Sequence, residues 1–154
     1  MTAHLTSDPM LPQPYVVRGL LKETPDTFTL KLSPETESNV SSFQPGQFSM
    51  LWVFGVGELP ISISGDPAEH SQLVYTVRSV GQATNSLVTR TLGEGVGVRG
   101  PFGAGWPLHA ARNRDVIVAA DAPFTDLAKF FRLVNDTLQT PMQMGTMAII
   151  ASPK

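Results

Sequence analysis

The stretch LVYTVRSVGQATNSL, residues 73–87, contains a strand pattern that is followed directly by a helix pattern. Residues 73–80 form two alternating sets, which is typical of a β-strand with one buried face: Leu73, Tyr75, Val77 and Ser79 on one side, and Val74, Thr76, Arg78 and Val80 on the other. We expect Thr84 to be the N-cap of a short helix, and Leu87, Val88 and Leu92 to form its apolar stripe. The stretch therefore predicts a β fold that is interrupted by one helix.

Further strand patterns lie on both sides of this stretch. They cover residues 15–21, 27–32, 47–54, 59–64 and 95–99, and turns rich in glycine and proline separate them. In residues 27–32, for example, Phe28, Leu30 and Leu32 share one face. Six short strands joined in this way predict a mostly β fold, a six-stranded antiparallel Greek-key barrel with one capping helix.

The pattern changes after Pro107. Residues 115–120 (DVIVAA) form a continuous apolar run, residues 125–138 follow a helical period, and residues 147–151 are apolar again. We interpret this region as a single βαβ unit of a truncated nucleotide-binding domain. The predicted organisation is a flexible N-terminus in residues 1–12, a barrel in residues 13–109 and the partial βαβ unit in residues 115–154.

Composition excludes several classes of site and partner. The 154 residues include no cysteine, so we expect no disulfide, no thiolate metal site and no iron–sulfur cluster in this chain. The three histidines are scattered, and we expect no other metal site. The net charge of −2, without a basic run, argues against nucleic acid as a partner. No apolar segment is long enough to cross a bilayer and no signal peptide is recognisable, so we predict a cytoplasmic location without membrane insertion.

Four segments, in this order and at this spacing, resemble the flavin-binding barrel of the ferredoxin–NADP reductase superfamily. They are FQPGQFSML (residues 43–51), LPISISG (59–65), TVRSVGQATNSL (76–87) and VRGPFGAGWPL (98–108). The branch that they resemble most contains the electron-transfer subunits of dihydroorotate dehydrogenase and the gamma subunits of soluble nickel–iron hydrogenases and sulfhydrogenases. The resemblance covers about residues 13–120 and implies that FAD is the cofactor.

The resemblance also implies where FAD would bind. Pro60, Ile61 and Ser62 would line the isoalloxazine ring, and Ser62 would form a hydrogen bond near the flavin N5. The residues expected along the ribityl and adenosine side are Thr76, Val77 and Arg78. Leu59 occupies the position of the arginine that in this family meets the pyrophosphate, and Arg78 is a possible replacement for that charge.

The residues at the start of the predicted helix have their own chemical reason to bind a diphosphate. Unpaired N–H groups and the positive end of the helix dipole attract an anion at Gly81, Ala83 and Thr84, and the small Ala83 side chain allows close approach. The alternative interpretation is an ordinary capped helix beside a solvated Arg78. For residues 59–63 the alternative is an apolar barrel strand without a ligand.

The sequence departs from the family pattern in its second half. After DVIVAA, residues 121–124 contain no glycine, and Asp121 places a carboxylate where a pyrophosphate would bind. We therefore do not expect this chain to use NAD(P)H by itself. The glycines of residues 100–106 are interpreted as structural, because they permit a tight backbone path. Their spacing is not a dinucleotide fingerprint, because they do not connect a strand to a helix.

Two functions follow as hypotheses. The first is an FAD-binding electron-transfer domain or subunit of an oxidoreductase complex, whose partners are other subunits of a hydrogenase- or dehydrogenase-like assembly. The alternative is a cofactor-free structural or docking subunit of a redox complex that retains the reductase barrel. A barrel that binds some other small ligand is a third option, which no residue specifies. No catalytic residue is assigned, so the chain would be an enzyme component only through a bound flavin.

Overall fold

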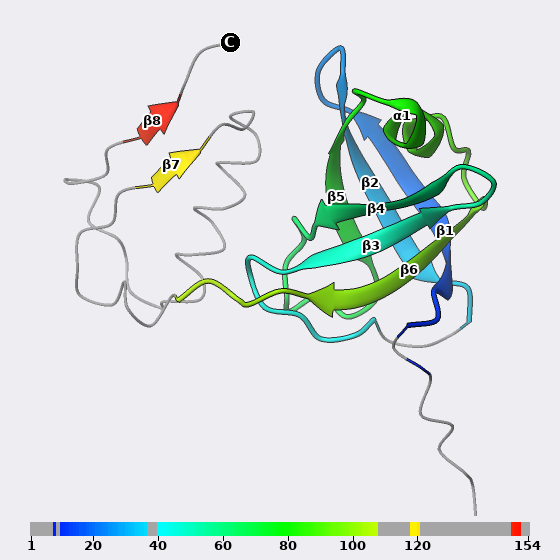
Figure 1. The fold of residues 1–154 in the computed structure, drawn as a ribbon, viewed down its shortest axis with the longest axis horizontal. Helices are drawn as coiled ribbons and strands as arrows, with labels where there is room; N and C mark the ends of the chain where they lie inside the picture. Colours follow the sequence, from blue (N-terminus) through cyan, green and yellow to red (C-terminus); the bar gives the residue numbers. More distant parts are fainter. Residues whose placement is uncertain (1–7, 9, 37–39, 108–117, 121–148, 152–154) are drawn as a thin grey trace, which may run out of the picture. The chain divides into compact units, whose positions relative to one another are not determined.

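The computed structural model describes residues 8, 10–36, 40–107, 118–120 and 149–151 (Figure 1). The chain divides into two compact units, Met1–Ala104 and Gly105–Lys154. The domain boundary that the sequence places between residues 109 and 115 lies outside the described residues, as does the predicted helix of residues 125–138.

The first unit is a six-stranded antiparallel sheet in the order β4-β3-β6-β1-β2-β5. Its strands are β1 (Gln13–Lys22), β2 (Thr27–Pro34), β3 (Phe48–Val53), β4 (Gly57–Ser62), β5 (Leu73–Arg78) and β6 (Gly95–Phe102). The two ends of the sheet meet at an antiparallel bridge between Ile63 and Tyr75, which closes the sheet into a barrel (Figure 1). Because β6 lies between β3 and β1, the connections cross over as in a Greek key. The predicted mostly β, six-stranded fold with one helix is confirmed.

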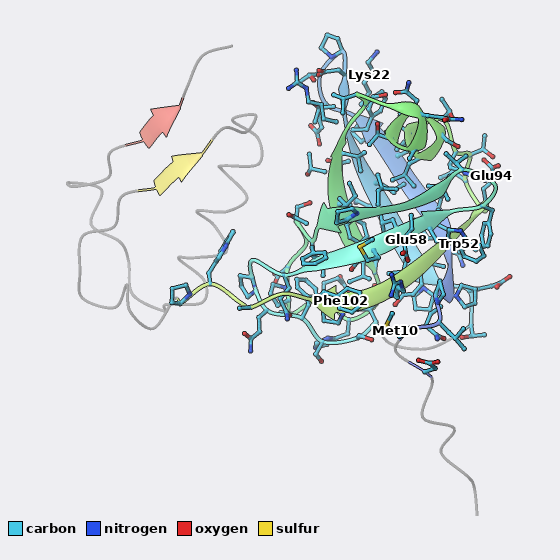
Figure 2. The ribbon with its side chains drawn as sticks, viewed as in Figure 1. Met10, Lys22, Trp52, Glu58, Glu94 and Phe102 are labelled. Carbon is cyan, nitrogen blue, oxygen red and sulfur yellow. The ribbon has the colours of Figure 1, made fainter. Side chains whose placement is uncertain are left out.

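Alternation along each strand builds the core of the barrel. In β2, Leu30 and Leu32 are fully buried whereas Lys31 between them is exposed, as the period of two predicts. The same alternation in β3 buries Leu51 and leaves Trp52 more than one third exposed. Figure 2 shows Trp52 on the outside of the barrel. The inward side chains of all six strands form one cluster, so the barrel has a single hydrophobic core.

The helix α1 (Gln82–Val88) differs from the prediction at both ends. Its N-cap is Gly81, and Thr84 is the third helical residue. From there the Thr84 hydroxyl accepts hydrogen bonds from the N–H groups of Val80 (3.0 Å) and Gly81 (2.9 Å). The prediction that Thr84 is the N-cap was wrong, because a threonine at the third helical position can also reach back to the residues that precede the helix.

The helix also ends earlier than predicted. Thr89 is its C-cap, and the Thr89 hydroxyl donates to carbonyl groups in the last turn. Leu92 lies beyond this end and is 70% exposed, so it is not part of the apolar stripe. Leu87 and Val88 are buried, and α1 contacts β3, β4 and β5 (Figure 1). The helix therefore covers one end of the barrel with two apolar side chains.

The segment that leaves the barrel uses glycine for its backbone path. Gly100 and Gly103 have φ values of 125° and 82°, a conformation that other residues rarely adopt. Phe102, between them, lies 5.9 Å from Phe48 between ring centroids. This agrees with the structural role that the sequence suggests for these glycines.

The second unit contains two short strands in the described residues. β7 (Val118–Ala120) and β8 (Ile149–Ala151) pair in parallel, with Val118 opposite Ile149. Parallel neighbours need a crossover connection, which is what a βαβ unit provides.

Candidate functional site

The residues directly after β4, Ile63 and Ser64, bring the two ends of the sheet together. The Ile63 N–H donates to the Gln47 carbonyl at 3.0 Å, and the Ser64 N–H donates to the Val74 carbonyl at 2.9 Å. On the outside of this junction, the hydroxyl groups of Ser64 and Thr76 are 3.1 Å apart. The exterior faces of β4 and β5 therefore form one continuous surface.

Strand alternation decides which predicted residues reach this surface. In β4, Pro60 and Ser62 are exposed, while Ile61 packs against the core. In β5, Arg78 is exposed and Thr76 is half-buried, while Val77 is fully buried. The side chains of Ile61 and Val77 are thus on the inside, and only their backbone atoms can face a ligand on the exterior. Leu59 also packs against the core.

The turn between β5 and α1 continues the same surface. Gly81 is exposed, and Ala83 and Thr84 are half-buried. The turn is held in place by the Ser79 hydroxyl, which donates to the Asn85 side chain at 2.5 Å. The first N–H groups of a helix have no acceptor within the helix, so this turn offers backbone donors beside β5. We call the following residues the exterior site: Pro60, Ser62, Thr76, Arg78, Gly81, Ala83 and Thr84.

Arg78, the cation of the exterior site, forms an ion pair in the structure. Its Nε lies 2.7 Å from Oδ2 of Asp26, in the turn between β1 and β2. Both side chains are exposed (58% and 43%), and such pairs contribute little to stability. The hydrogen bond from Arg78, followed by that from Thr24, holds the pKa of Asp26 below its ordinary value of 3.8. Asp26 is therefore ionised at neutral pH and compensates the charge of Arg78.

Sequence reasoning missed Asp26. The residue stands directly before a predicted strand, which gives no sign of a charged partner fifty residues later. Its position follows from the register of β2 and β5, in which Thr27 is opposite Arg78. The pairing of β2 with β5 is therefore the information that would have identified Asp26 as the partner of Arg78.

In the described part of the chain, no three histidine, cysteine or acidic side chains gather closely enough to hold a metal ion. The helix described there is too short to cross a membrane.

The sequence was compared with protein-family models and with curated proteins. No protein-family model matches the chain. Over 99 residues the chain is 35% identical to a probable dihydroorotate dehydrogenase B (NAD(+)), electron transfer subunit, of Methanocella arvoryzae, a match that covers 64% of this chain and 35% of the relative. It is 33% identical over 100 residues to sulfhydrogenase 1 subunit gamma of Pyrococcus furiosus, covering 65% of this chain and 34% of that subunit. The chain thus spans about a third of the length of these curated relatives.

A solved structure agrees on the fold. The flavohem-like FAD/NAD-binding domain of nitric oxide dioxygenase from Vibrio cholerae superposes with a TM-score of 0.71 at 17% identity, covering 90% of this chain and 61% of the other. At this identity the match concerns the fold alone. Over about two thirds of its length, the chain is therefore homologous to a probable electron transfer subunit of dihydroorotate dehydrogenase B and to a sulfhydrogenase gamma subunit, and it has the ferredoxin–NADP reductase-like barrel.

Proposed function

We propose that the barrel is an FAD-binding electron-transfer module of an oxidoreductase complex. The observation that carries this proposal is the exterior site. Three separate segments, residues 60–62, 76–78 and 81–84, contribute outward side chains or backbone donors to one surface that runs from β4 over β5 to the start of α1. A long, flat ligand with a diphosphate needs such a surface, apolar at one end and rich in donors at the other.

The described residues fit the cofactor in most respects. Pro60 provides an apolar contact for a ring, and the Ser62 hydroxyl can donate to a ring nitrogen or oxygen. Backbone N–H groups at Ala83 and Thr84 can bind phosphate oxygens. FAD supplies the electron-carrying chemistry, and the protein contributes binding, orientation and electrostatics.

The negatively charged pyrophosphate of FAD requires a cationic partner on the exterior surface. Leu59 packs against the core and cannot approach a phosphate on the exterior. Within the exterior site, Arg78 is the cation, and it must exchange its hydrogen bond with Asp26 for one with the phosphate. The pair is solvent-exposed, so this exchange is energetically accessible.

Partners are proposed from the relatives. Those relatives are named as subunits, one for electron transfer and one of a sulfhydrogenase. We propose that this barrel likewise associates with other redox subunits in the cytoplasm and that it does not use NAD(P)H by itself.

A cofactor-free docking subunit is the second candidate. Two observations favour it: the inward position of Leu59 and the pairing of Arg78 with Asp26. A barrel of this kind would keep the fold and the partner contacts without binding flavin.

Visible absorption distinguishes the two candidates. The full chain is purified, its spectrum is recorded, and excess FAD is added and then removed by desalting. Riboflavin, which lacks the diphosphate, is the matched control. A flavin spectrum retained with FAD and lost with riboflavin supports the electron-transfer module. A colourless protein after both treatments supports the docking subunit.

A further inference from the structure

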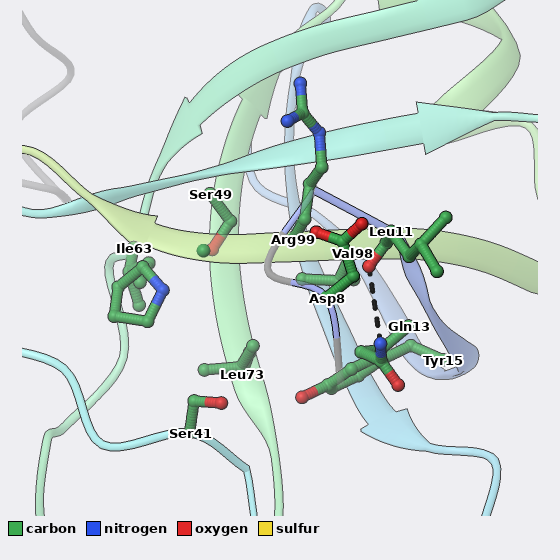
Figure 3. Close-up of a pocket in the computed structure, with 12 residues that line it drawn as sticks. Asp8, Leu11, Gln13, Tyr15, Ser41, Ser49, Ile63, Leu73, Val98 and Arg99 are labelled. Carbon is green, nitrogen blue, oxygen red and sulfur yellow. Dashed lines mark hydrogen bonds between the residues drawn. The ribbon is translucent and has the colours of Figure 1, made fainter. Parts of the chain in front are cut away.

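A cavity of about 240 Å³ opens into the barrel (Figure 3). It lies where β5 begins, at Leu73, whereas α1 follows the other end of β5. Its inner wall contains Tyr15, Ser49, Ile63 and Val98 in addition to Leu73. The cavity shares no residue with the exterior site.

Two buried hydroxyl groups belong to this wall. Tyr15 is only 7% exposed, and among the described residues its hydroxyl has no hydrogen-bond partner. Figure 3 shows that this hydroxyl points into the cavity, and burial raises the pKa of Tyr15 above 10.0, so the group stays protonated at neutral pH.

The second hydroxyl is that of Ser49, which is 1% exposed. It accepts a hydrogen bond of 2.9 Å from the Tyr75 hydroxyl, and no acceptor for its own proton is found in the described part of the chain. A buried donor without an acceptor is unfavourable. Tyr15 and Ser49 therefore provide two donors for a guest in the cavity.

The remaining inner wall is apolar. Ile63, Leu73 and Val98 are buried members of the hydrophobic core. The volume exceeds the roughly 150 Å³ of a cavity that binds benzene and is below the roughly 300 Å³ at which typical small-molecule sites begin. The cavity therefore suits a molecule of about one ring.

Charges at the mouth select against anions. Asp8 lines the mouth, and its carboxylate accepts the N–H of Met10 at 2.9 Å. Arg99 also lines it, but the Arg99 guanidinium donates to both carboxylate oxygens of Glu58, at 2.5 and 2.6 Å. Since Glu58 already compensates Arg99, the Asp8 carboxylate is left to repel an anionic ligand.

We propose that this cavity is a binding site for a small neutral molecule of about one ring, whose carbonyl or hydroxyl oxygen accepts a hydrogen bond from the Tyr15 hydroxyl, with the Ser49 hydroxyl as a second donor in the wall. The site is independent of the exterior site, and its occupation does not require flavin.

The test is a titration of the full chain, monitored by amide chemical shifts, with three probes of similar size. Acetophenone carries an acceptor oxygen, ethylbenzene lacks it, and benzoate adds a negative charge. We expect saturable binding of acetophenone, weaker binding of ethylbenzene and the weakest binding of benzoate, with shifts around residues 15, 49 and 73. Absence of saturable acetophenone binding overturns the proposal.

Two substitutions locate the site. Tyr15→Phe keeps the ring and removes the hydroxyl, so acetophenone affinity should fall about tenfold while ethylbenzene affinity changes less than twofold. Unchanged acetophenone affinity in this variant contradicts the assigned role of Tyr15. Leu73→Phe should fill the cavity and abolish binding of both probes, whereas Leu21→Phe, the same change at an exposed position of β1, should not alter it. Equal binding by these two leucine variants would place the probe elsewhere and refute the site.

Discussion

The exterior site and the cavity belong to one barrel and share strand β5, but they use opposite faces of it. In β5, the exterior site takes Thr76 and Arg78, while the core and the cavity take Leu73, Tyr75 and Val77. The exterior residues come from short continuous segments, so a motif can represent them. The cavity residues come from five separate segments and form no motif. The difference shows why one site is visible in the sequence and the other is not.

The two regions should also respond differently to substitution. Exterior side chains are solvated and make few contacts, so their loss should affect ligand binding and hardly affect stability. Buried side chains around the cavity are hydrogen-bonded or packed, so their loss should affect stability and hardly affect binding at the exterior site.

The largest expected effect is that of Arg78→Ala on FAD. Removing the cation of the exterior site should weaken FAD binding by about 10- to 100-fold, as expected for lost hydrogen bonds to a charged group. Quenching of flavin fluorescence measures the affinity. The thermal midpoint should change little, because the Arg78 side chain is 58% exposed.

Arg18→Ala is the matched control for this substitution. Arg18 is an exposed arginine of β1, outside the exterior site. We expect its removal to leave FAD affinity within about twofold, because a distant solvated charge is screened by salt. Equal losses in both variants would show only a general charge effect and would contradict the role of Arg78.

The second largest effect is expected on stability, from a substitution inside the barrel. Ser49→Ala removes the acceptor of the buried Tyr75 hydroxyl and should reduce the free energy of unfolding by about 1–3 kcal/mol. Denaturant unfolding measures this loss, and Tyr15→Phe, which removes a hydroxyl without a partner among the described residues, should cause almost none. A similar loss in both variants would contradict the distinction between the two hydroxyls. FAD affinity should remain unchanged in both.

The smallest effect is expected for Asp26→Asn. Without the opposing carboxylate, Arg78 is freer to approach a phosphate, and FAD affinity should rise by up to about fivefold. Asp66→Asn, the same change in an exposed loop, should not have this effect. A decrease in FAD affinity for Asp26→Asn would contradict the competition between Asp26 and the cofactor.

The pH dependence of the same pair follows from the lowered pKa of Asp26. A carboxyl whose folded-state pKa lies below its unfolded value contributes stability above that value and loses it as pH falls through the folded pKa. Below about pH 4 the contribution of Asp26 to the free energy of unfolding should therefore decline. The Asp26→Asn variant should lack this part of the decline in stability with falling pH. The affinity gain of Asp26→Asn should persist throughout the neutral range.

Much of the barrel could be predicted from the sequence because alternation is a local property. Leu30 and Leu32 share a buried face because residues two apart in a strand point to the same side of the sheet. The strand of residues 73–78 was recognisable in the same way. The Greek-key order agreed with the resemblance to the superfamily, which alternation alone does not supply.

The features that could not be predicted depend on contacts between distant residues. Leu92 has the spacing of a helical stripe, but the helix ends at Val88, and the side chain is exposed. The pairing of Arg78 with Asp26 depends on strand register, and the inward position of Ile61 depends on the phase of β4. The cavity depends on how five segments meet at one end of the barrel.

Mapping FAD on the amide spectrum of the full chain tests the central claim most directly. We expect saturable shift changes at residues 62, 76, 78 and 81–84, and none at Tyr15, which lines the cavity and lies on β1, a strand that contributes no residue to the exterior site. The same pattern should be lost in Arg78→Ala and retained in Arg18→Ala. A spectrum that does not change with FAD, or changes confined to the cavity residues, would contradict the assignment of the exterior site as a flavin-binding surface.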